Sequence, residues 1–452
     1  MVRWFLIILS IVAITLTATL VFDSTVLRLT TIIAGICLVL WLSETVPPFV
    51  PSFLLWTLVP LLLGSIDKSF NLVNVLTWAV DPVLALFFGG FVLGVGSERY
   101  GLDKRLANAA LKWSGKSFGK FLLLVILLTA FLSMWMSNIA AAALMLACLR
   151  PILLDLQIDN FLRRALLIGV ALGADLGGIA TPIGTGPNAI AISSMSSTGQ
   201  SVSFLGWMIF ALPLSVGMLL AGFLLILLRV RRTKDEWTSE LGRLNQILFV
   251  DKKNEMQTPG EIGFLCVLGG TILLWLTEPF HSVPAAVVSL GVTSFLFLSG
   301  MLQKEDLLRI DWSTLLLIAG GITLGRLLEQ SAIVASIATN VPFSDLNPIF
   351  GLFLLCLASA TLSALMSNTA TVVMLIPLAL ALIPQPSTAI LVAISASFGM
   401  PFVISTPPNA MVYGEGGVKF NDLFLPGIVL MVFGCLLISL TGRIVLNFIG
   451  IP

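Results

Sequence analysis

The sequence has little charge and few of the residues on which most catalytic and metal sites depend. Only 10% of its 452 residues are Asp, Glu, Lys or Arg, and His281 is the one histidine. The five cysteines form no Cys-x-x-Cys pair, and each lies in a separate apolar run. These shortages argue against a zinc or iron–sulfur site and against a histidine-based catalytic dyad. The net charge is only +1 and no basic face is present, so nucleic acid is not an expected partner.

What the chain has instead is apolar sequence. Hydrophobic residues make up 58% of it, and the mean hydropathy is +1.05. Because this composition suits lipid as the solvent, we predict an all-α polytopic membrane protein with about 11 transmembrane helices. The first apolar run, Trp4 to Phe22, has no small-residue cleavage site before Asp23. We therefore expect a retained N-terminal transmembrane helix within residues 1–25 rather than a signal peptide.

Two segments of the first half, residues 26–228, depart from simple spans. Residues 121–154 are apolar but too long for one helix and too short for two full ones, so we predict a re-entrant hairpin. Residues 162–202 contain glycines and prolines in their middle, which predicts a helix broken within the membrane. The remaining spans of this half are expected near 26–43, 46–63, 81–97 and 204–228, with an amphipathic helix in the interface at 98–119.

The second half repeats this plan after a polar linker at 229–261, which we expect to be cytosolic. Residues 262–452 contain a second predicted hairpin at 350–383 and a second broken helix at 388–413. Their other spans are expected near 262–277, 284–300, 313–328 and 424–449. With a cytoplasmic N-terminus, all but four of the 24 Lys and Arg residues fall on the cytosolic side. The two hairpins then enter from opposite faces, so we predict an inverted repeat. The four residues left outside are Arg28, Lys68, Arg326 and Arg443.

The hairpin and the broken helix each carry a motif that occurs twice. Leu132–Ala140 contains Ser-Asn at its centre and returns as Leu362–Ala370, while Gly184–Asn188 returns as Ser405–Asn409. Neither motif contains Lys or Arg, yet both supply hydroxyl and amide groups inside apolar surroundings, where polar groups usually bind something. Such neutral groups suit Na⁺ through their oxygens and an anion through their N–H groups. Each ion would lower the cost of dehydrating the other.

On these residues the chain resembles the divalent anion/sodium symporter (DASS) family of di- and tricarboxylate and sulfate carriers. The motifs that carry the resemblance are Ser137-Asn138, Ser367-Asn368-Thr369 and the two helix breaks. The resemblance implies a homodimer that works as an elevator, in which the hairpins and broken helices slide against a scaffold of the remaining spans. It implies no cofactor besides Na⁺ as the coupling ion. It further implies that the substrate contacts Asn138, Thr185, Asn368, Thr369 and Thr406, and that two sodium sites are lined by Ser133, Ser137, Asn138 and Gly184, and by Ser363, Ser367, Asn368 and Ser405.

Two positions depart from the duplicated pattern. Ile139 stands where the family motif has threonine, so we expect that restoring threonine changes affinity or selectivity. Asp175 lies in the first broken helix, where the second repeat has Ala396. An intramembrane carboxyl group is a candidate proton or coupling site, although a carboxyl group that only bonds backbone is the alternative.

We therefore expect a secondary active transporter, not an enzyme, in the plasma (inner) membrane. Its expected activity is Na⁺-coupled uptake of C4-dicarboxylates such as succinate, malate and fumarate. A symporter of sulfate or another inorganic dianion, and a cation-independent dicarboxylate exchanger, are the alternatives. An ion channel fits poorly because re-entrant tips from opposite sides favour an occluded site. An intramembrane hydrolase would need a nucleophile paired with a base, which Asp175 alone does not supply.

Overall fold

The structure is a computed structural model, which describes residues 2–43, 45–102, 117–155, 161–197, 199–230, 259–333, 336 and 346–451. Within these ranges every regular element is a helix, which confirms the prediction of an all-α fold. Most of the predicted amphipathic helix at 98–119 and of the linker at 229–261 lies outside the described residues.

The helices are numbered along the chain, with η for short 3₁₀ turns. Those of the first half are α1 (Val2–Val21), α2 (Thr25–Ser43), α3 (Val50–Leu62), η1 (Lys68–Phe70), α4 (Leu72–Ala79), α5 (Pro82–Arg99), α7 (Phe118–Ser133), α8 (Asn138–Asp155), α9 (Phe161–Gly177), η2 (Gly178–Ala180), α10 (Gly186–Ser197) and α11 (Phe204–Val230). Those of the second half are α13 (Pro259–Leu276), α14 (Glu278–His281), α15 (Ala285–Leu298), η3 (Lys304–Arg309), α16 (Trp312–Gln330), α18 (Pro348–Leu365), α19 (Asn368–Leu382), α20 (Pro386–Ala396), α21 (Pro407–Gly414) and α22 (Phe420–Phe448).

Several of these helices have the length and composition of membrane spans. Among the described residues, five helices satisfy both criteria: α5, α11, α13, α18 and α22. Eight further apolar helices, or parts of helices, of 10–17 residues include α3, both helices of the first predicted hairpin (α7 and α8), α19 of the second, and α20. Short apolar helices are expected where the chain turns back or breaks inside the membrane, because neighbouring protein can then bond the freed backbone groups.

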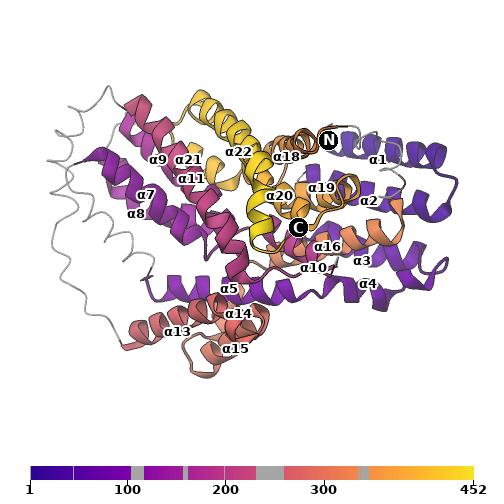
Figure 1. The fold of residues 1–452 in the computed structure, drawn as a ribbon, viewed down its shortest axis with the longest axis horizontal. Coiled ribbons are helices and arrows are strands. Elements are labelled where there is room, and N and C mark those ends of the chain that lie inside the picture. Colours follow the sequence, from indigo (N-terminus) through magenta and orange to yellow (C-terminus); the bar gives the residue numbers. More distant parts are fainter. Residues whose placement is uncertain are drawn as a thin grey trace.

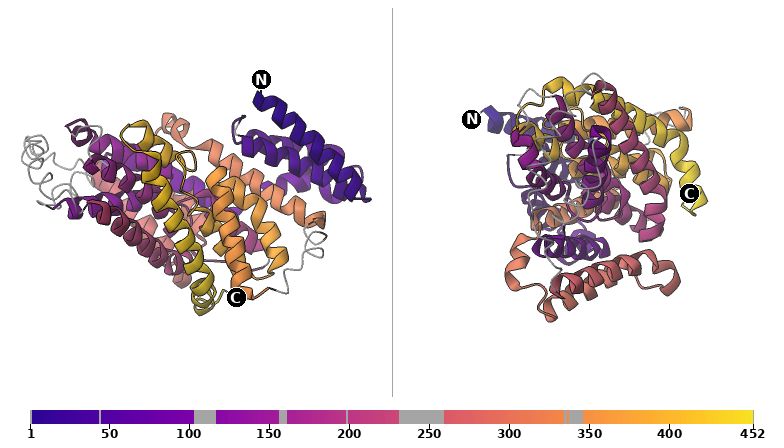
Figure 2. Two further views of the ribbon diagram at one scale, coloured as in Figure 1. Left: turned by 90° about the horizontal axis from the view of Figure 1, so that it is seen from above. Right: turned by 90° about the vertical axis from the view of Figure 1, so that its left-hand side faces the viewer.

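The helices form an elongated body (Figures 1 and 2). Helices α1–α4 gather at one end and α7–α9 at the other, while α13, α14 and α15 lie along α5. Helix α15 packs directly against α5, and α16 packs against α3 and α4. The centre of the body, between its two ends, is occupied by α10, α16, α19 and α20 (Figure 1).

Corresponding helices of the two halves make corresponding contacts. Helix α7 packs against α8 and α9, and α18 packs against α19 and α20. The second parts of the two interrupted segments then cross over: α10 packs against α19 and α20, whereas α21 packs against α8 and α9. This exchange brings each helix break next to the hairpin of the other half. The assignment of the halves to an inverted repeat remains a prediction.

Candidate functional site

The first hairpin turns at the duplicated Ser-Asn motif. Helix α7 ends at Ser133 and α8 begins at Asn138. The Ser137 hydroxyl accepts a hydrogen bond from the Ala140 amide at 3.3 Å, which caps the start of α8. Ser133 Oγ lies 2.8 Å from the Asn138 side-chain amide and donates to the Ala174 carbonyl of α9 at 2.6 Å. The predicted ligands Ser133, Ser137 and Asn138 therefore lie together, against the backbone of the first broken helix.

The second hairpin turns in the same way. Helix α18 ends at Leu365 and α19 begins at Asn368. The Ser367 hydroxyl accepts from the Ala370 amide at 3.2 Å, and Ser363 Oγ donates to Asn368 Oδ1 at 2.6 Å. In both hairpins the serine five residues before the asparagine is buried and the asparagine is half-buried. Each asparagine is thus held by a buried hydroxyl while part of its amide remains accessible.

A second pair of asparagines, in the helix breaks, organises the unwound backbone. Asn188 Nδ2 donates to the carbonyls of Gly178 (3.0 Å) and Thr181 (2.8 Å). Asn409 Nδ2 donates to the carbonyls of Met400 (3.0 Å) and Phe402 (2.9 Å). Because a helix that stops inside the membrane frees backbone carbonyls, these amides supply donors that the helix no longer provides. The repeated sequence contained both residues, but nothing in it revealed which carbonyls they bond.

The first break leaves no room for side chains where it meets the first tip. A Cβ atom on Gly184 would lie 2.3 Å from the Gly178 carbonyl oxygen, and one on Gly178 would lie 2.6 Å from the side-chain amide of Asn138. In the amide orientation that satisfies its neighbours, Asn138 Nδ2 donates to Ser133 Oγ and to the carbonyls of Gly184 and Ala174. Gly184, predicted as a ligand, is therefore in direct contact with the tip.

Side chains of one half also contact the other half. Thr406 Oγ1, in the second break, donates to Asp175 Oδ2 of α9 at 2.8 Å. At the second tip, Thr369 lies against the start of α10, since a Cβ atom on Gly186 would lie 2.4 Å from Thr369 Oγ1. These contacts bring the predicted residues of the two halves into one place. The sequence offered no signal for the Asp175–Thr406 pair, which joins residues 231 positions apart.

Asp175 is the one acidic side chain among these groups. It is 1% exposed, and its Oδ1 atom has no hydrogen-bond partner within the described part of the chain. Asn188 Oδ1 is likewise buried without a partner there. Buried acceptor atoms are normally satisfied, and a carboxylate in lipid surroundings is costly unless it meets a cation or a proton. The first break thus presents two acceptor oxygens that suit a positively charged species.

The remaining predicted residues bond mainly within their own turns or helix starts. Thr406 also caps α21 by accepting from the Asn409 amide at 3.3 Å. Ser405 Oγ donates to the Phe402 carbonyl within its own turn at 2.6 Å, and Thr185 is half-buried just before α10. Ile139 is 47% exposed, whereas its counterpart Thr369 is 9% exposed.

Helix α11 supplies further support for the first break. Trp207 Nε1 donates to the Ile179 carbonyl at 3.0 Å, and Ser215 Oγ donates to the Leu176 carbonyl at 2.7 Å. Both side chains are buried. These two bonds show that α11 is attached to the broken helix and positions its backbone. Sequence reasoning missed both residues, because a single Trp or Ser in an apolar run gives no sign of its partner.

Apolar helices of spanning length, two helix hairpins with polar tips, and two helix breaks that each contact the other half define a polytopic membrane transporter. The family model described as "Citrate transporter" matches residues 4–389 and 347–450, which together cover nearly the whole chain. The chain belongs to this citrate transporter family. It is an integral membrane protein and not an enzyme, and the match agrees with the resemblance to the divalent anion/sodium symporters.

Individual relatives and a solved structure extend this result. An uncharacterized transporter of Haemophilus influenzae is 30% identical, covering 89% of this chain and 88% of that protein. The sodium-dependent dicarboxylate transporter SdcS of Staphylococcus saprophyticus is 26% identical over 85% of this chain and 79% of its own length. The inorganic phosphate transporter PHO87 of Saccharomyces cerevisiae is 28% identical over 85% of this chain but only 42% of its own length. The YdaH transporter of Alcanivorax borkumensis has a similar fold (TM-score 0.57, 13% identity, 90% of this chain and 100% of that one).

Proposed function

We propose that this transporter carries C4-dicarboxylates such as succinate, malate and fumarate inward, coupled to Na⁺, and that the two hairpin tips and two helix breaks form one shared binding site. The observation that carries this proposal is the meeting of the duplicated neutral groups, with Thr369 against Gly186 and Thr406 on Asp175. A sodium-dependent dicarboxylate transporter among the relatives supports the same substrate class.

The chemistry of the donor set supports a substrate anion that binds together with a cation. The starts of α8, α10, α19 and α21 lie at the tips and breaks, and free amide N–H groups at a helix start attract negative charge. The tip and break motifs contain no Lys or Arg that could balance a dianion. A co-bound cation would supply that balance in a region of low dielectric constant.

The fit of Na⁺ to this site is supported by the acceptor oxygens described above. Asp175 Oδ1 and Asn188 Oδ1 are buried acceptors that need a donor or a cation. Hard oxygen ligands of this kind suit Na⁺, and the Ser-Asn tips add hydroxyl and amide oxygens. We propose Asp175 as the coupling group of the first half. Because the second half has Ala396 at the matching position, only the first half would bind its cation through a carboxylate.

The motion that we propose is an elevator in which the hairpins and broken helices move together. Because α11 is bonded to α9 and η2, and α22 packs against α18 and α20, we include α11 and α22 in the moving body. Helices α5 and α16 then form the fixed surface that faces α10 and α19. We further propose that the protein is a homodimer in the inner membrane with a cytoplasmic N-terminus, which light scattering of the purified protein and accessibility labelling would test.

The proposal is tested by uptake of radiolabelled succinate into proteoliposomes under inward gradients of Na⁺, K⁺ or choline. We expect saturable uptake with Na⁺ and uptake near background with choline. Equal saturable uptake in all three salts would contradict sodium coupling and favour the exchanger. No saturable uptake of any C4-dicarboxylate would contradict the substrate class.

An inorganic dianion is the second candidate, and the relative described as an inorganic phosphate transporter favours it. The neutral hydroxyl and amide groups can bond phosphate or sulfate oxygens as well as carboxylates. Competition distinguishes the two candidates. Excess unlabelled succinate should abolish labelled succinate uptake, whereas sulfate and phosphate at the same concentration should leave it nearly unchanged. The opposite order of competition would make the inorganic dianion the substrate.

A further inference from the structure

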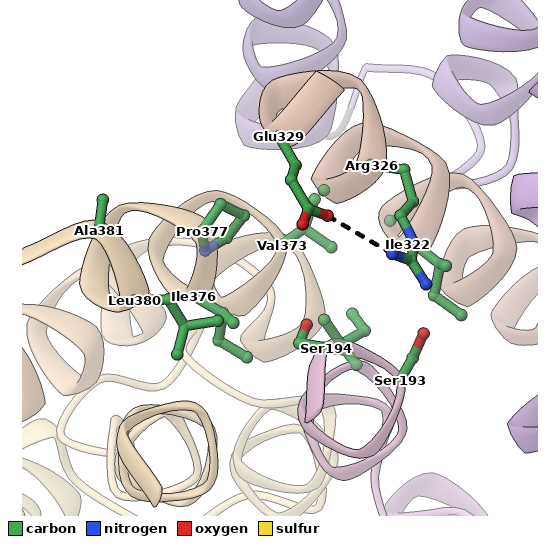
Figure 3. A pocket seen from close by; sticks show the side chains of 13 residues that line it. Ser193, Ser194, Ile322, Arg326, Glu329, Val373, Ile376, Pro377, Leu380 and Ala381 are labelled. Carbon is green, nitrogen blue, oxygen red and sulfur yellow. Dashed lines mark hydrogen bonds and ion pairs between the residues drawn. The ribbon is translucent and has the colours of Figure 1, made fainter. Parts of the chain in front are cut away.

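A cavity of about 210 Å³ lies between α10, α16 and α19, separate from the tips themselves (Figure 3). Most of its walls are apolar, and its polar side chains come from two helices: Ser193 and Ser194 from α10, and Arg326 and Glu329 from α16. Arg326 and Glu329 are the charged residues that line it in the described part of the chain. Figure 3 shows Arg326 and Glu329 above this space, the side chains of α19 to its left, and Ser193 and Ser194 below it.

The cavity leads toward the proposed site. Its lining includes Ile190 and Val373, which follow Gly186 and Thr369 by four residues on α10 and α19. Gly186 and Thr369 contact one another at the site. The cavity therefore begins about one helical turn, about 6 Å, from that contact. It continues along α19 to Leu380 and Ala381, close to the end of that helix at Leu382.

The two charges are ordered along this path. Arg326 Nη1 and Glu329 Oε2 are 3.5 Å apart, and their side chains are 33% and 57% exposed. Glu329 is next to the last residue of α16, and Arg326 lies almost one turn further in. A pair of this length and exposure is weak, so another anion can compete for the guanidinium.

The nearby Asp81 carboxylate accepts from Ser193 at 2.6 Å and caps α5 through the Val83 amide at 2.9 Å. Asp81 is thus already compensated by hydrogen bonds and a helix start.

The arginine has no counterpart in the other half. Gly-Gly-x-x-x-Gly occurs in α5 (Gly89, Gly90, Gly94) and again in α16 (Gly320, Gly321, Gly325). Aligned on these glycines, Val95 corresponds to Arg326 and Glu98 corresponds to Glu329. Glu98 pairs instead with Arg309 at 2.5 Å, at the other end of the fold. Among the residues that the structure describes, no charged one lines the cavity of about 380 Å³ beside the first tip.

We propose that the cavity between α10, α16 and α19 is a waiting site, where the transported dianion binds before it reaches the hairpin tips. One substrate carboxylate there replaces the Glu329 carboxylate as the ion-pair partner of Arg326. This inference rests on the proposed function and adds a ligand to it. The anion passes Glu329, is held by Arg326, and then reaches the neutral tips one turn further in. Because Arg326 lies on one side only, the subsite acts on substrate arriving from that face, which the distribution of positive charge predicts to be the outside.

The test is the KM for labelled succinate measured from both faces, in intact cells and in inside-out vesicles, under equal Na⁺ gradients. We expect Arg326→Gln to raise the KM from its own face about fivefold, with kcat and the KM from the opposite face changed less than about twofold. Glu329→Gln should lower the KM from that face, and Arg326→Lys should restore part of the loss. Added choline chloride should raise the KM of the unaltered protein more than that of Arg326→Gln, because salt screens an exposed charge. Arg309→Gln, which removes a comparable pair at the other end, is the matched control and should leave the KM from the Arg326 face unchanged.

The outcomes separate this inference from the function on which it rests. Saturable Na⁺-dependent uptake with an unchanged KM in Arg326→Gln and Glu329→Gln would overturn the waiting site and leave the proposed function standing. An equal change from both faces would also overturn it, since that result indicates a structural role. If Arg326→Gln does not fold, Glu329→Gln and Arg326→Lys give the same decision. If the unaltered protein shows no saturable dianion uptake, both proposals fail.

Discussion

The two hairpin tips are built alike but lie in different surroundings. Each has a buried serine bonded to an asparagine five residues later, at 2.8 Å in the first tip and 2.6 Å in the second. Helix α19, which begins at the second tip, packs against α10, α16 and α20, and Thr369 is 9% exposed. At the first tip the corresponding Ile139 is 47% exposed. The duplicated residues therefore give both tips the same internal hydrogen bonds, while residues outside the shared Ser-Asn pair differ in how exposed they are.

The two broken helices also differ between the halves, because the first has Asp175 where the second has Ala396. Asp175 and Ala396 are both buried at matching positions, but only Asp175 reaches the other half, through Thr406. Such a bond between segments far apart in sequence ties the first broken helix to the second break. The first half thus supplies the carboxyl group and the second half supplies the hydroxyl that positions it.

The largest effect is expected from removing either tip amide. Asn138→Ala and Asn368→Ala should each lower initial succinate uptake by more than about 30-fold, because an unreplaced bond to a charged ligand is worth about 2 kcal/mol or more. Uptake by monodisperse protein in proteoliposomes is the measurement. Asn347→Ala is the control, since Asn347 caps α18 far from the tip through the Ile349 amide. Normal kinetics in either tip variant would show that this tip does not bind substrate.

Removing the charge of Asp175 should weaken the binding of the coupling cation without destabilising the fold. Asp175→Asn keeps an oxygen that can accept from Thr406, so the link between the halves is retained. We expect the Na⁺ concentration for half-maximal uptake to rise about tenfold, because a neutral amide binds a cation less well than a carboxylate. Thr406→Val, which removes the hydroxyl and keeps the charge, should change Na⁺ dependence less. Unaltered Na⁺ dependence in Asp175→Asn would leave Asp175 as a structural group only.

Filling either break should destabilise the protein where the helices touch. Gly178→Ala places a methyl group 2.6 Å from the Asn138 side-chain amide, and Gly399→Ala places one 2.4 Å from the Ala360 carbonyl. Overpacking of this kind costs about 1–3 kcal/mol, so both variants should melt at lower temperature than the unaltered protein. Gly217→Ala in α11 is the matched control, because nothing lies within 4 Å of its added methyl group. A control that melts as low as the two variants would indicate that any added methyl group is harmful.

The smallest effect is expected at Ile139. The sequence alone predicts that threonine at this position changes affinity or selectivity. Because the Ile139 side chain is 47% exposed, we instead expect Ile139→Thr to change the KM for succinate less than about twofold. The reverse exchange, Thr369→Ile, should raise the KM clearly, because Thr369 is buried against Gly186. Dose–response curves for the two variants side by side would test the contrast. A large change in the KM for succinate in Ile139→Thr would mean that the first tip closes over position 139 during transport.

Much of the framework could be predicted from the sequence because its causes are local. Lipid selects apolar runs, so the ends of α2 (Thr25–Ser43) and α11 lie within two residues of the spans expected at 26–43 and 204–228. Glycine and proline interrupt helices, and the chain is unwound between η2 and α10 where Thr181-Pro182 and Gly184 stand. The short helix α4 was missed because its eight residues are too few for a span.

The site itself could be predicted only in part. Duplication identified Ser133, Asn138 and their counterparts, and the structure places them at the two tips. The crossing of α10 and α21 onto the opposite half could not be predicted, since it depends on packing between segments more than 200 residues apart. For the same reason, the Asp175–Thr406 bond and the carbonyl partners of Asn188 became apparent only in three dimensions.

The central claim is that the two halves build a single binding site, and the stoichiometry of succinate binding tests it most directly. Equilibrium binding of labelled succinate to purified protein in Na⁺ should give one succinate per chain. Binding should be lost in Asn138→Ala and lost equally in Asn368→Ala, because both tips contact the same molecule. Two succinates per chain, with each variant losing only one of them, would contradict the claim and indicate a separate site at each tip.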